Sequence, residues 1–438
     1  MISSARRRVF LLLCLIALLL SGGCVAVAPA SPDSGALVVL WHTFTGADAE
    51  TLKVLTDRFN AANTGVVLVT EYQDRILERL QSVAPQNRPD LVVIWPQDLP
   101  DYVSQGLVGT LPLESPLISR DSPDLLPMAS ALYRFEGQLQ ALPLGLATYL
   151  MYYNPSWLAD LGYAADEADW EALRSAACAA TNPLRGYTGL GIPARSSVLM
   201  ALLAASGAQI VNDEGYFGFS DSAGKAATDV LYEILLGACG TVYEDRSVGP
   251  VQLSASALAM VIESSEYYAE LETAVMEEGK FTLGVSALPG LAAQGATLWY
   301  GPGMVIVSSD PAQRQPALVV LEWFYSIDAQ LAWTATTHYL PVRRSIVTSR
   351  LSDEDTSSMQ QVYQVVLDAA TEGTWVVWPP YMDQMACRAS LLRVMLSLSE
   401  AGRVPSAYLD TAVTACNTGV RQPMSPAQIR SSDGGSAP

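Results

Sequence analysis

The stretch from Ala36 to Asn60, ALVVLWHTFTGADAETLKVLTDRFN, constrains the fold more than any other part of this chain. It opens with a short apolar run, Leu37 to Trp41, which is typical of a strand buried on both faces of a parallel sheet. Thr45 stands three residues before Asp48, a spacing that favours the start of a helix, and apolar residues then recur at helical intervals. The stretch therefore predicts a strand, a loop and a helix.

The same pattern is repeated at once. Residues 66–69 and 91–94 predict two further strands and residues 76–83 a second helix face, so residues 36–95 are expected to form a βαβαβ unit. In open α/β sheets, ligands bind at the carboxyl ends of the strands, where helix amino ends converge. Four side chains are expected at this edge: Trp41, Phe44, Trp95 and Asp98.

Composition limits the class of protein. A length of 438 residues exceeds what one hydrophobic core usually organises, so two lobes are expected. With 50% hydrophobic and only 16% charged residues, the chain does not have the composition of a disordered protein. The 44 acidic residues against 25 basic ones argue against nucleic acid as a partner, because phosphate binding needs a basic face.

Residues 1–24 predict an export signal. Three arginines, Arg6 to Arg8, precede the apolar run Val9 to Leu20, which is too short for a permanent membrane helix and fits a signal-peptide core. The ending resembles the lipobox of bacterial lipoproteins, with Cys24 as the lipidated residue, although Ser21 stands where Leu is expected. An ordinary secretory signal with an incidental cysteine is the alternative.

Removal of the signal would leave 22 basic residues against 44 acidic ones, a net charge near −22. Residues 25–35 are rich in Pro, Ala and Ser and are expected to form a flexible tether.

Beyond Cys14 and Cys24 of the signal, four cysteines remain, and they favour disulfides over a metal site. No CxxC pair or Cys/His cluster exists, which argues against zinc, and an even number of cysteines in an exported protein favours pairing. The expected pairs are Cys178 with Cys239 and Cys387 with Cys416, because the members of each pair flank predicted helices of one segment. Free buried thiols are the alternative.

Two segments are expected to cross between the lobes. Leu142 to Asn154, LPLGLATYLMYYN, predicts an extended strand that carries Tyr149, and Tyr339 to Arg344 predicts a second crossing. The expected division is residues 36–145 and 281–338 for the N-terminal lobe, 146–280 and 339–420 for the C-terminal lobe, and 421–438 for a disordered tail.

Taken in order, several segments resemble the sugar-type bacterial extracellular solute-binding proteins of ABC importers, the group that includes maltose-binding protein. They are LVVLWHTFTG, RPDLVVIWPQDLPDYVSQGLVGTL, GQLQALPLGLATYLMYYNPSWLADLG, LWYGPGMVIVS and HYLPVRRS. The resemblance covers nearly the whole mature chain. It implies a type II periplasmic-binding-protein-like α/β fold, in which two α/β lobes joined by crossing hinge strands close around a ligand.

Sugar chemistry fits the residues available. A sugar has apolar ring faces and a hydroxyl edge, so its site needs flat aromatic side chains together with carboxylates, amides or arginine. The chain has 9 Trp and 19 Tyr. The candidate ligand-binding residues are Trp41, Phe44, Asp98, Tyr149, Glu263, Trp299, Tyr300, Tyr339, Arg343 and Trp378. For each of them a purely structural role is the alternative.

The expected function is a monomeric, lipid-anchored receptor that captures a carbohydrate and delivers it to an ABC permease. Such a protein works at the outer face of the cytoplasmic membrane or in the periplasm. A polyamine or another cation is the alternative ligand, because aromatics and carboxylates also bind cations. Sugar phosphates are less favoured, since the candidate loops offer few cations beyond Arg343.

A secreted, membrane-anchored glycoside hydrolase is the alternative from a different class, with Asp98 and Glu263 as the carboxylate pair. However, the sequence has no GxSxG, HExxH or P-loop motif. We therefore expect no enzymatic activity, no metal and no cofactor.

Overall fold

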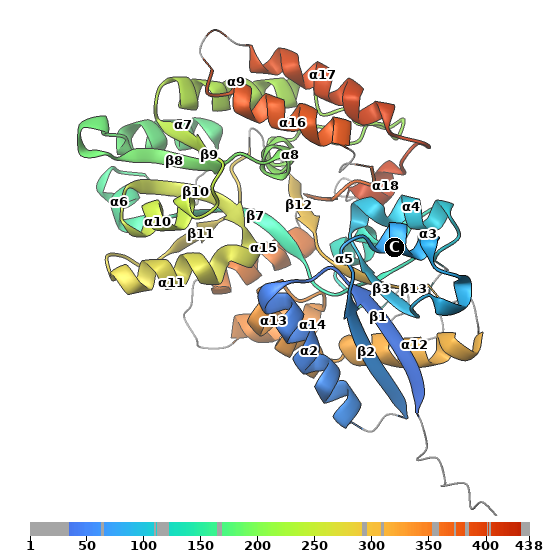
Figure 1. The fold of residues 1–438 in the computed structure, drawn as a ribbon. Helices are drawn as coiled ribbons and strands as arrows, with labels where there is room; N and C mark the ends of the chain where they lie inside the picture. The colour runs from blue at the N-terminus through green and yellow to red at the C-terminus, as the bar shows by residue number, and fades with distance from the viewer. Residues whose placement is uncertain are drawn as a thin grey trace, which may run out of the picture.

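The computed structural model describes residues 35–62, 65–108, 111, 122–163, 169–290, 296–307, 311–352, 359–371, 374–381, 385–400, 402 and 404–430. Within these residues the chain forms two mixed β-sheets, each accompanied by helices, and a small hairpin. Figure 1 shows the two sheet-containing parts next to each other, with β1, β2 and β3 in one and β7, β8 and β10 in the other. This arrangement agrees with the two α/β lobes expected from the sequence.

The smaller sheet comes mainly from the beginning of the chain. In the described residues its strand order is β2-β1-β3-β13-β6. Strand β1 runs parallel to β2 and β3, while β13 runs antiparallel to β3 and β6. The strands are β1 (Ala36–His42), β2 (Val66–Tyr72), β3 (Leu91–Ile94), β6 (Leu142–Pro143) and β13 (Gly303–Ile306).

The predicted βαβαβ unit is confirmed. Helix α2 (Gly46–Ala61) buries Leu52, Leu55 and Phe59, which recur at helical spacing. Thr45 occupies the N-cap position, but its side chain makes no capping hydrogen bond. The other elements of this part are α3 (Ile76–Ser82), η1 (Pro85–Asn87), η2 (Pro96–Asp98), α4 (Leu99–Ser104), α5 (Pro127–Leu132), the hairpin β4 (Arg134–Phe135) and β5 (Gln138–Leu139), α12 (Pro311–Phe324) and α13 (Ile327–Thr337).

The larger sheet follows the order β14-β12-β7-β10-β8-β9 in the described residues, and β11 also pairs with β7. Strand β10 runs antiparallel to β7 and parallel to β8, so the sheet is mixed. Its strands are β7 (Ala147–Tyr153), β8 (Thr188–Pro193), β9 (Gly240–Tyr243), β10 (Leu258–Ser264), β11 (Gly284–Ser286), β12 (Ala296–Tyr300) and β14 (Thr374–Val377).

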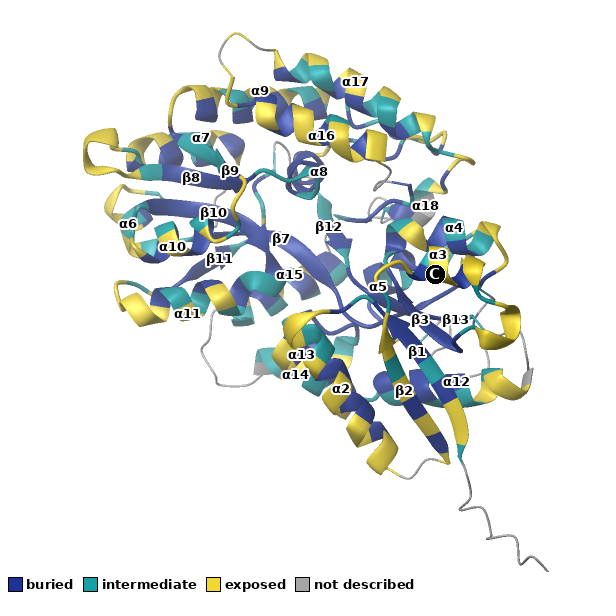
Figure 2. Cartoon of the chain, viewed as in Figure 1, coloured by how far each residue is buried: buried dark blue, intermediate teal, exposed yellow. Residues whose placement is uncertain are grey.

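Helix α8 (Ser196–Ala205) lies at the centre of this part, because every residue from Val198 to Ala205 is buried. A helix that is apolar all round packs against neighbours on all sides. Figure 2 shows most strands of both sheets buried, apart from β2 and the start of β1, and the outer faces of the surrounding helices exposed. The other helices here are α6 (Pro155–Asp160), α7 (Trp170–Ala180), η4 (Pro183–Arg185), α9 (Ser222–Leu236), α10 (Val248–Ser254), η5 (Ser265–Tyr267), α11 (Tyr268–Glu278), α14 (Arg344–Ser352), α15 (Met359–Thr371), α16 (Met385–Ser397), α17 (Pro405–Thr418) and α18 (Pro426–Ile429).

Three segments pass between the two sheets and contact one another. Leu146 and Leu340 exchange backbone hydrogen bonds of 2.9 and 2.7 Å, and the Leu144 N–H donates to the Pro302 carbonyl at 2.8 Å. A Cβ atom on Gly301 would lie 2.1 Å from the Gly145 carbonyl oxygen, so only glycine permits this approach. The single strand expected over 142–154 is therefore two strands, β6 and β7, separated by a crossing.

The sheets divide the chain differently from the expected lobe boundaries at one place. Strands β11 and β12 lie within the range 281–338 that we assigned to the N-terminal lobe, yet both pair with β7 of the larger sheet. The chain returns to the smaller sheet only at β13.

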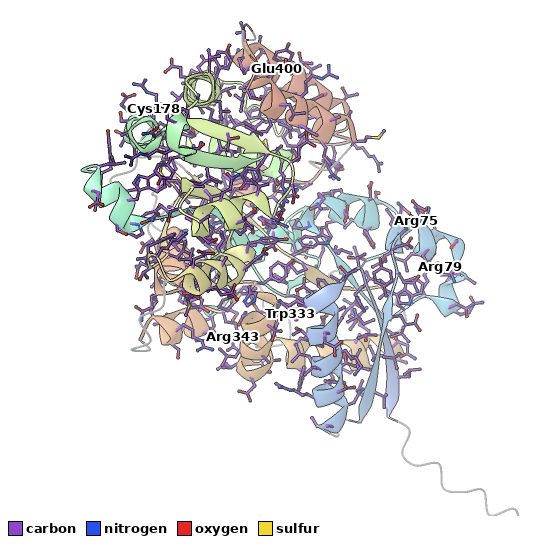
Figure 3. The ribbon with its side chains drawn as sticks, turned by 60° about the vertical axis from the view of Figure 1, so that its left-hand side comes forward. Arg75, Arg79, Cys178, Trp333, Arg343 and Glu400 are labelled. Carbon is purple, nitrogen blue, oxygen red and sulfur yellow. A yellow bond between two sulfur atoms is a disulfide. The ribbon has the colours of Figure 1, made fainter. Side chains whose placement is uncertain are left out.

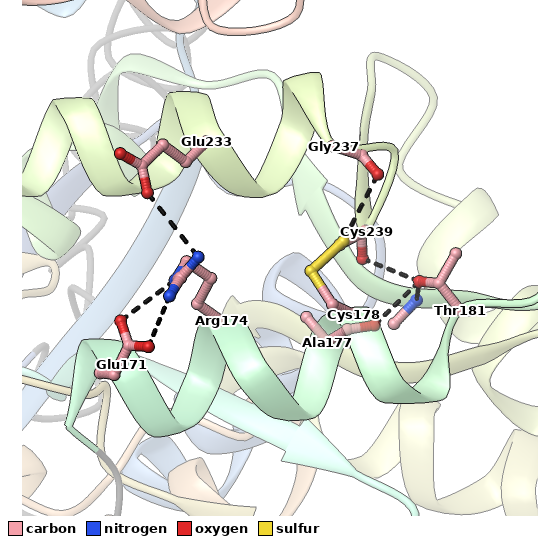
Figure 4. Close-up of a disulfide and its surroundings, with 9 residues drawn as sticks. Glu171, Arg174, Ala177, Cys178, Thr181, Glu233, Gly237 and Cys239 are labelled. Atoms are coloured by element: carbon pink, nitrogen blue, oxygen red, sulfur yellow. Dashed lines mark hydrogen bonds and ion pairs between the residues drawn. A yellow bond between two sulfur atoms is a disulfide. The ribbon is translucent and has the colours of Figure 1, made fainter.

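Two disulfides join the expected cysteines, Cys178 with Cys239 and Cys387 with Cys416. The first links α7 to the residue after the turn that ends α9, as Figure 4 shows. The second links α16 to α17. The first therefore fastens α7 to the connection between α9 and β9, and the second fastens two helices of the larger part to each other.

The described C-terminal residues run along both parts of the molecule. Arg421 forms an ion pair of 2.7 Å with Asp101 beside the smaller sheet, whereas the Met424 N–H donates to Gly215 of the larger part at 2.8 Å. Met424 is buried. Residues 421–430 thus differ from the disordered tail expected there; residues 431–438, the signal 1–24 and the tether up to residue 34 lie outside the described residues.

Candidate functional site

A cavity of about 230 Å³ lies where elements of the two sheets meet, and we call it the arginine cavity. Trp95 and Gln97 reach it from the loop after β3 of the smaller sheet. Its other lining residues come from the larger part: Tyr149, Arg195, Ser196, Ser197, Arg246, Glu266, Tyr300, Trp378 and Arg388. The cavity thus has walls from both lobes, as a ligand site that closes by lobe rotation requires.

Three aromatic side chains of the larger part form one group in this cavity. The Tyr149 and Tyr300 rings are 5.7 Å apart, and the Tyr300 and Trp378 rings are 6.1 Å apart in an edge-to-face arrangement. The Tyr149 hydroxyl donates to Ser197 Oγ at 2.7 Å. Burial raises the pKa of Tyr149 to about 12, so its hydroxyl stays protonated and neutral.

Arg246 is held by carboxylates at the end of β10. Its Nη2 donates to Glu263 Oε1 at 3.1 Å and lies 3.8 Å from Glu266 Oε1. The guanidinium also stacks over the Tyr267 ring, 3.0 Å from the ring centre. Burial raises the pKa of Glu266 to about 7, against the opposing effects of Arg246 and of a hydrogen bond from Tyr339.

A second cavity of about 650 Å³, the acidic cavity, shares Glu266 with the first. Its carboxylates are Asp48 from the start of α2, Glu266, and Glu270 and Glu277 from α11. Burial raises the pKa of Asp48 to about 6. Tyr339 lines this cavity and stacks in parallel on Trp333, which Figure 3 labels, with ring centres 6.2 Å apart.

Four of the ten predicted ligand-binding residues line these two cavities. Tyr149, Tyr300 and Trp378 line the arginine cavity, and Tyr339 lines the acidic cavity. Each was predicted from its place in the chain: Tyr149 in the first crossing, Tyr300 in the loop near the end of β12, Trp378 after β14 and Tyr339 in the second crossing. Their contact with a ligand stays a prediction.

Three predicted aromatic residues lie within the core and line neither cavity. The Trp41 indole donates to Glu71 Oε2 at 2.9 Å along the β1 and β2 pair. Phe44 packs on Trp333 with ring centres 5.3 Å apart. Trp299 is fully buried in β12, beside the strands β7 and β14. Packing thus accounts for these rings, which the sequence placed near turns or element ends.

The charged candidates also lie outside both cavities. Arg343 forms an ion pair with Asp124 at 2.6 Å and donates to the Tyr325 carbonyl at 2.9 Å, so it joins the second crossing to the smaller part. Glu263 accepts a hydrogen bond from Arg246 and is only 1% exposed. Asp98 is exposed and does not line the arginine cavity, whereas the preceding residue, Gln97, does.

Sequence reasoning missed the three arginines of the first cavity. Arg195 follows β8 and precedes α8, and Arg246 lies between β9 and α10. Both therefore follow strand ends, a position that could have marked them as candidates. Arg388 lies within α16, and nothing local marks it as a site residue. The candidate loops do offer few cations beyond Arg343, but these three arginines reach the cavity from other segments.

No group of three or more His, Cys, Asp or Glu side chains within the described residues could hold a metal ion. The helices of the described part are all too short or too polar to cross a membrane.

Sequence comparison decides the family. Residues 55–361 match the family model of the bacterial extracellular solute-binding proteins. The chain belongs to this family. No relative among curated protein sequences matches the chain.

Solved structures show the fold of this solute-binding protein. A cyclo/maltodextrin-binding protein in complex with maltotetraose is 16% identical, with a TM-score of 0.71 and coverage of 91% of this chain and 100% of that one. The GacH receptor of Streptomyces glaucescens, solved unliganded and with acarbose, is 19% identical, with a TM-score of 0.69 and coverage of 88% and 100%.

The cyclic α-maltosyl-1,6-maltose binding protein of Arthrobacter globiformis is 16% identical, with a TM-score of 0.68 and coverage of 90% of this chain and 98% of that one. Together these structures show that the solute-binding protein has the expected type II periplasmic-binding-protein-like fold, with two sheet-containing α/β lobes.

Proposed function

We propose that the protein is an extracytoplasmic receptor that captures a carbohydrate and delivers it to the permease of an ABC importer. One observation carries the proposal: the arginine cavity is lined by Trp95 of one lobe and by Tyr149, Tyr300 and Trp378 of the other. Aromatic faces and nearby hydroxyl, amide and charged groups suit a sugar, which has apolar ring faces and a polar edge. The similar solved proteins named above were crystallised with acarbose or maltotetraose, which supports the same class of ligand.

The proposed mechanism is a shift between open and closed states. A ligand that contacts Trp95 and Tyr149 at once stabilises the closed state, and its preference for that state drives closure. We place the lobe boundary near residues 300–303, because β12 and β13 belong to different sheets. The crossings around Gly145, Gly301 and Leu340 would act as the hinge.

Export and anchoring form part of the same proposal. The family is extracellular, which agrees with the predicted signal peptide. Lipidation of Cys24 would hold the protein, as a monomer, at the outer face of the cytoplasmic membrane near its permease.

A cationic solute such as a polyamine is the second candidate, and one observation favours it. Asp48, Glu266, Glu270 and Glu277 line the acidic cavity, where Tyr339 adds an aromatic ring. Carboxylates with an aromatic ring are a usual environment for ammonium groups.

The hydrolase alternative finds less support. A glycosidase needs two carboxylates facing one substrate. Of the suggested pair, Asp98 is exposed, and Glu263 is buried and bonded to Arg246.

Calorimetric titration of the purified protein with maltose, maltotetraose, glucose and spermidine tests the proposal. We expect binding of at least one sugar and its recovery unchanged afterwards by chromatography. Binding of spermidine alone would favour the cationic alternative. Hydrolysis of the oligosaccharide would refute the receptor function.

A further inference from the structure

The arginine cavity holds more positive charge than its own carboxylates neutralise. Three guanidinium groups line it, from Arg195, Arg246 and Arg388. Of these, Arg246 is paired with Glu263 and lies 3.8 Å from Glu266. The site therefore carries a local positive charge although the whole chain has a net charge of −19.

The side chains of Arg195 and Arg388 make no hydrogen bond or ion pair with any residue that the structure describes. Arg195 is half-buried, whereas Arg388 is exposed, so only Arg195 is partly desolvated. A partly desolvated guanidinium without an anion gains strongly from an ionic partner, and its planar fork matches the geometry of a carboxylate or a phosphate.

Helix α8 adds to the same potential. Ser196 and Ser197 line the cavity at the first turn of this ten-residue helix, and Arg195 holds the N-cap position without a side-chain capping bond. The N–H groups of a first turn have no partner within the helix, and they favour an anion. The two arginines and the helix end thus favour the same charge in one cavity.

The aromatic groups limit what else the ligand contains. Trp95 reaches the cavity from the smaller part, and Trp378 and Tyr300 form its other aromatic wall. The Nε1 of Trp378 is buried and makes no hydrogen bond to a described residue. An inorganic anion would leave these apolar faces uncovered, whereas a sugar that bears an acidic group would use both.

We propose that the solute is an acidic sugar whose carboxylate or phosphate ester binds between Arg195, Arg388 and the start of α8. The proposal rests on the carbohydrate-binding function proposed above and names the class of sugar. The ring of the sugar packs on the aromatic walls. A uronic acid and a sugar phosphate present the same charge to the arginines, and the experiment separates them.

The test compares matched ligands by calorimetry: glucose, glucuronate, glucose 6-phosphate and inorganic phosphate. The variants are Arg195→Gln, Arg388→Gln and their combination. Arg185→Gln is the control, because Arg185 is exposed in η4 and lines neither cavity. Circular dichroism and thermal unfolding check that each variant folds.

We expect the unchanged protein to bind one acidic sugar at least about tenfold more tightly than glucose, since charge-assisted hydrogen bonds typically contribute that much. Each single variant should lose about tenfold for the acidic sugar, and Arg185→Gln should lose nothing. A preference for glucuronate identifies a carboxylate, and one for glucose 6-phosphate identifies a phosphate ester.

Two results would overturn the inference. Equal affinity for glucose and for both acidic sugars, unchanged in the double variant, would refute the acidic sugar while leaving the receptor function standing. Binding of inorganic phosphate as tight as that of any sugar would show a simple anion site. If no sugar of either kind binds, including the neutral oligosaccharides, the carbohydrate function fails together with the inference.

Discussion

Arg246 Nη2 lies 3.1 Å from Glu263 Oε1, and this ion pair joins the loop before α10 to the end of β10. Glu263 is 1% exposed, and its second oxygen, Oε2, has no hydrogen-bond partner among the described residues. The same Glu263 carboxylate accepts from the Ser264 N–H at 2.9 Å. Glu263 therefore positions a residue of the arginine cavity without lining the cavity itself.

Replacing Glu263 by Gln should destabilise the protein, because Arg246 loses its nearest anion while the amide must remain buried. We expect the free energy of unfolding to fall by about 1–3 kcal/mol, the usual cost of a lost charged hydrogen bond. Urea-induced unfolding followed by fluorescence measures the change. Glu50→Gln, at an exposed position of α2, is the matched control. Equal unfolding midpoints for the two variants would contradict the positioning role.

Trp95 and Trp41 should respond differently to substitution. Trp95→Ala removes an aromatic wall of the arginine cavity, so the affinity for the solute found by titration should fall about tenfold. Trp41→Phe removes the hydrogen bond to Glu71 and should lower stability while affinity stays the same. Trp157→Ala, which removes a half-buried ring packed on Tyr187, is the control for the first variant. A larger loss of affinity in Trp41→Phe than in Trp95→Ala would exclude this assignment.

The carboxyl of Glu266 should make stability depend on pH. Its pKa rises from an ordinary value of 4.5 to about 7 in the folded protein, mainly through burial. Between these values the folded state binds more protons than the unfolded state, so stability falls as pH increases from about 4.5 to about 7. Below that range the carboxyl is protonated in both states and costs no stability, and above it the full cost of ionising the buried carboxyl is present.

Glu266→Gln removes this titration, so its stability should decline less than that of the unchanged protein over the same pH range. Thermal unfolding at closely spaced pH values measures the difference. Asp48, whose pKa burial raises to about 6, titrates in the same range in both proteins, so the difference between the curves reports Glu266 together with its effect on Asp48. Parallel curves for the two proteins would disprove the raised pKa.

A side chain at Gly301 should destabilise the protein. In Gly301→Ala the new Cβ would lie 2.1 Å from the Gly145 oxygen, which forces two crossing segments apart. We expect a loss of about 1–3 kcal/mol, as for other overpacked sites. Gly106→Ala serves as the comparison, because Gly106 also has positive φ but has open space around it. A larger effect at Gly106 would show that backbone conformation, not crowding, sets the cost.

The sequence was sufficient for elements with strong local patterns. The βαβαβ unit followed from apolar runs separated by helical spacing. The cysteine pairs followed from their places beside helices of one segment. Each of these features depends on residues that lie close together in the sequence or in one segment.

The site was harder to predict, because tertiary packing decides which aromatic rings stay accessible. Trp299 and Tyr300 are neighbours in β12, yet alternate side chains of a strand face opposite sides, so one is fully buried and the other lines the cavity. Arg388 lines the same cavity as Arg195 because α16 packs against α8. No spacing in the sequence reports a contact between residues so far apart.

The last described segment gives the two lobes a fourth link that is unlike the three crossings. Its ends are fastened to different lobes by ion pairs at the surface, Arg421 with Asp101 and Arg430 with Asp213. Exposed ion pairs contribute little free energy and weaken in salt, whereas the buried Met424 and Ile429 and the backbone bond from Met424 to Gly215 hold this segment more firmly. A rotation of the lobes would therefore have to rearrange buried contacts of Met424 and Ile429 in addition to the salt-sensitive ion pairs at the surface.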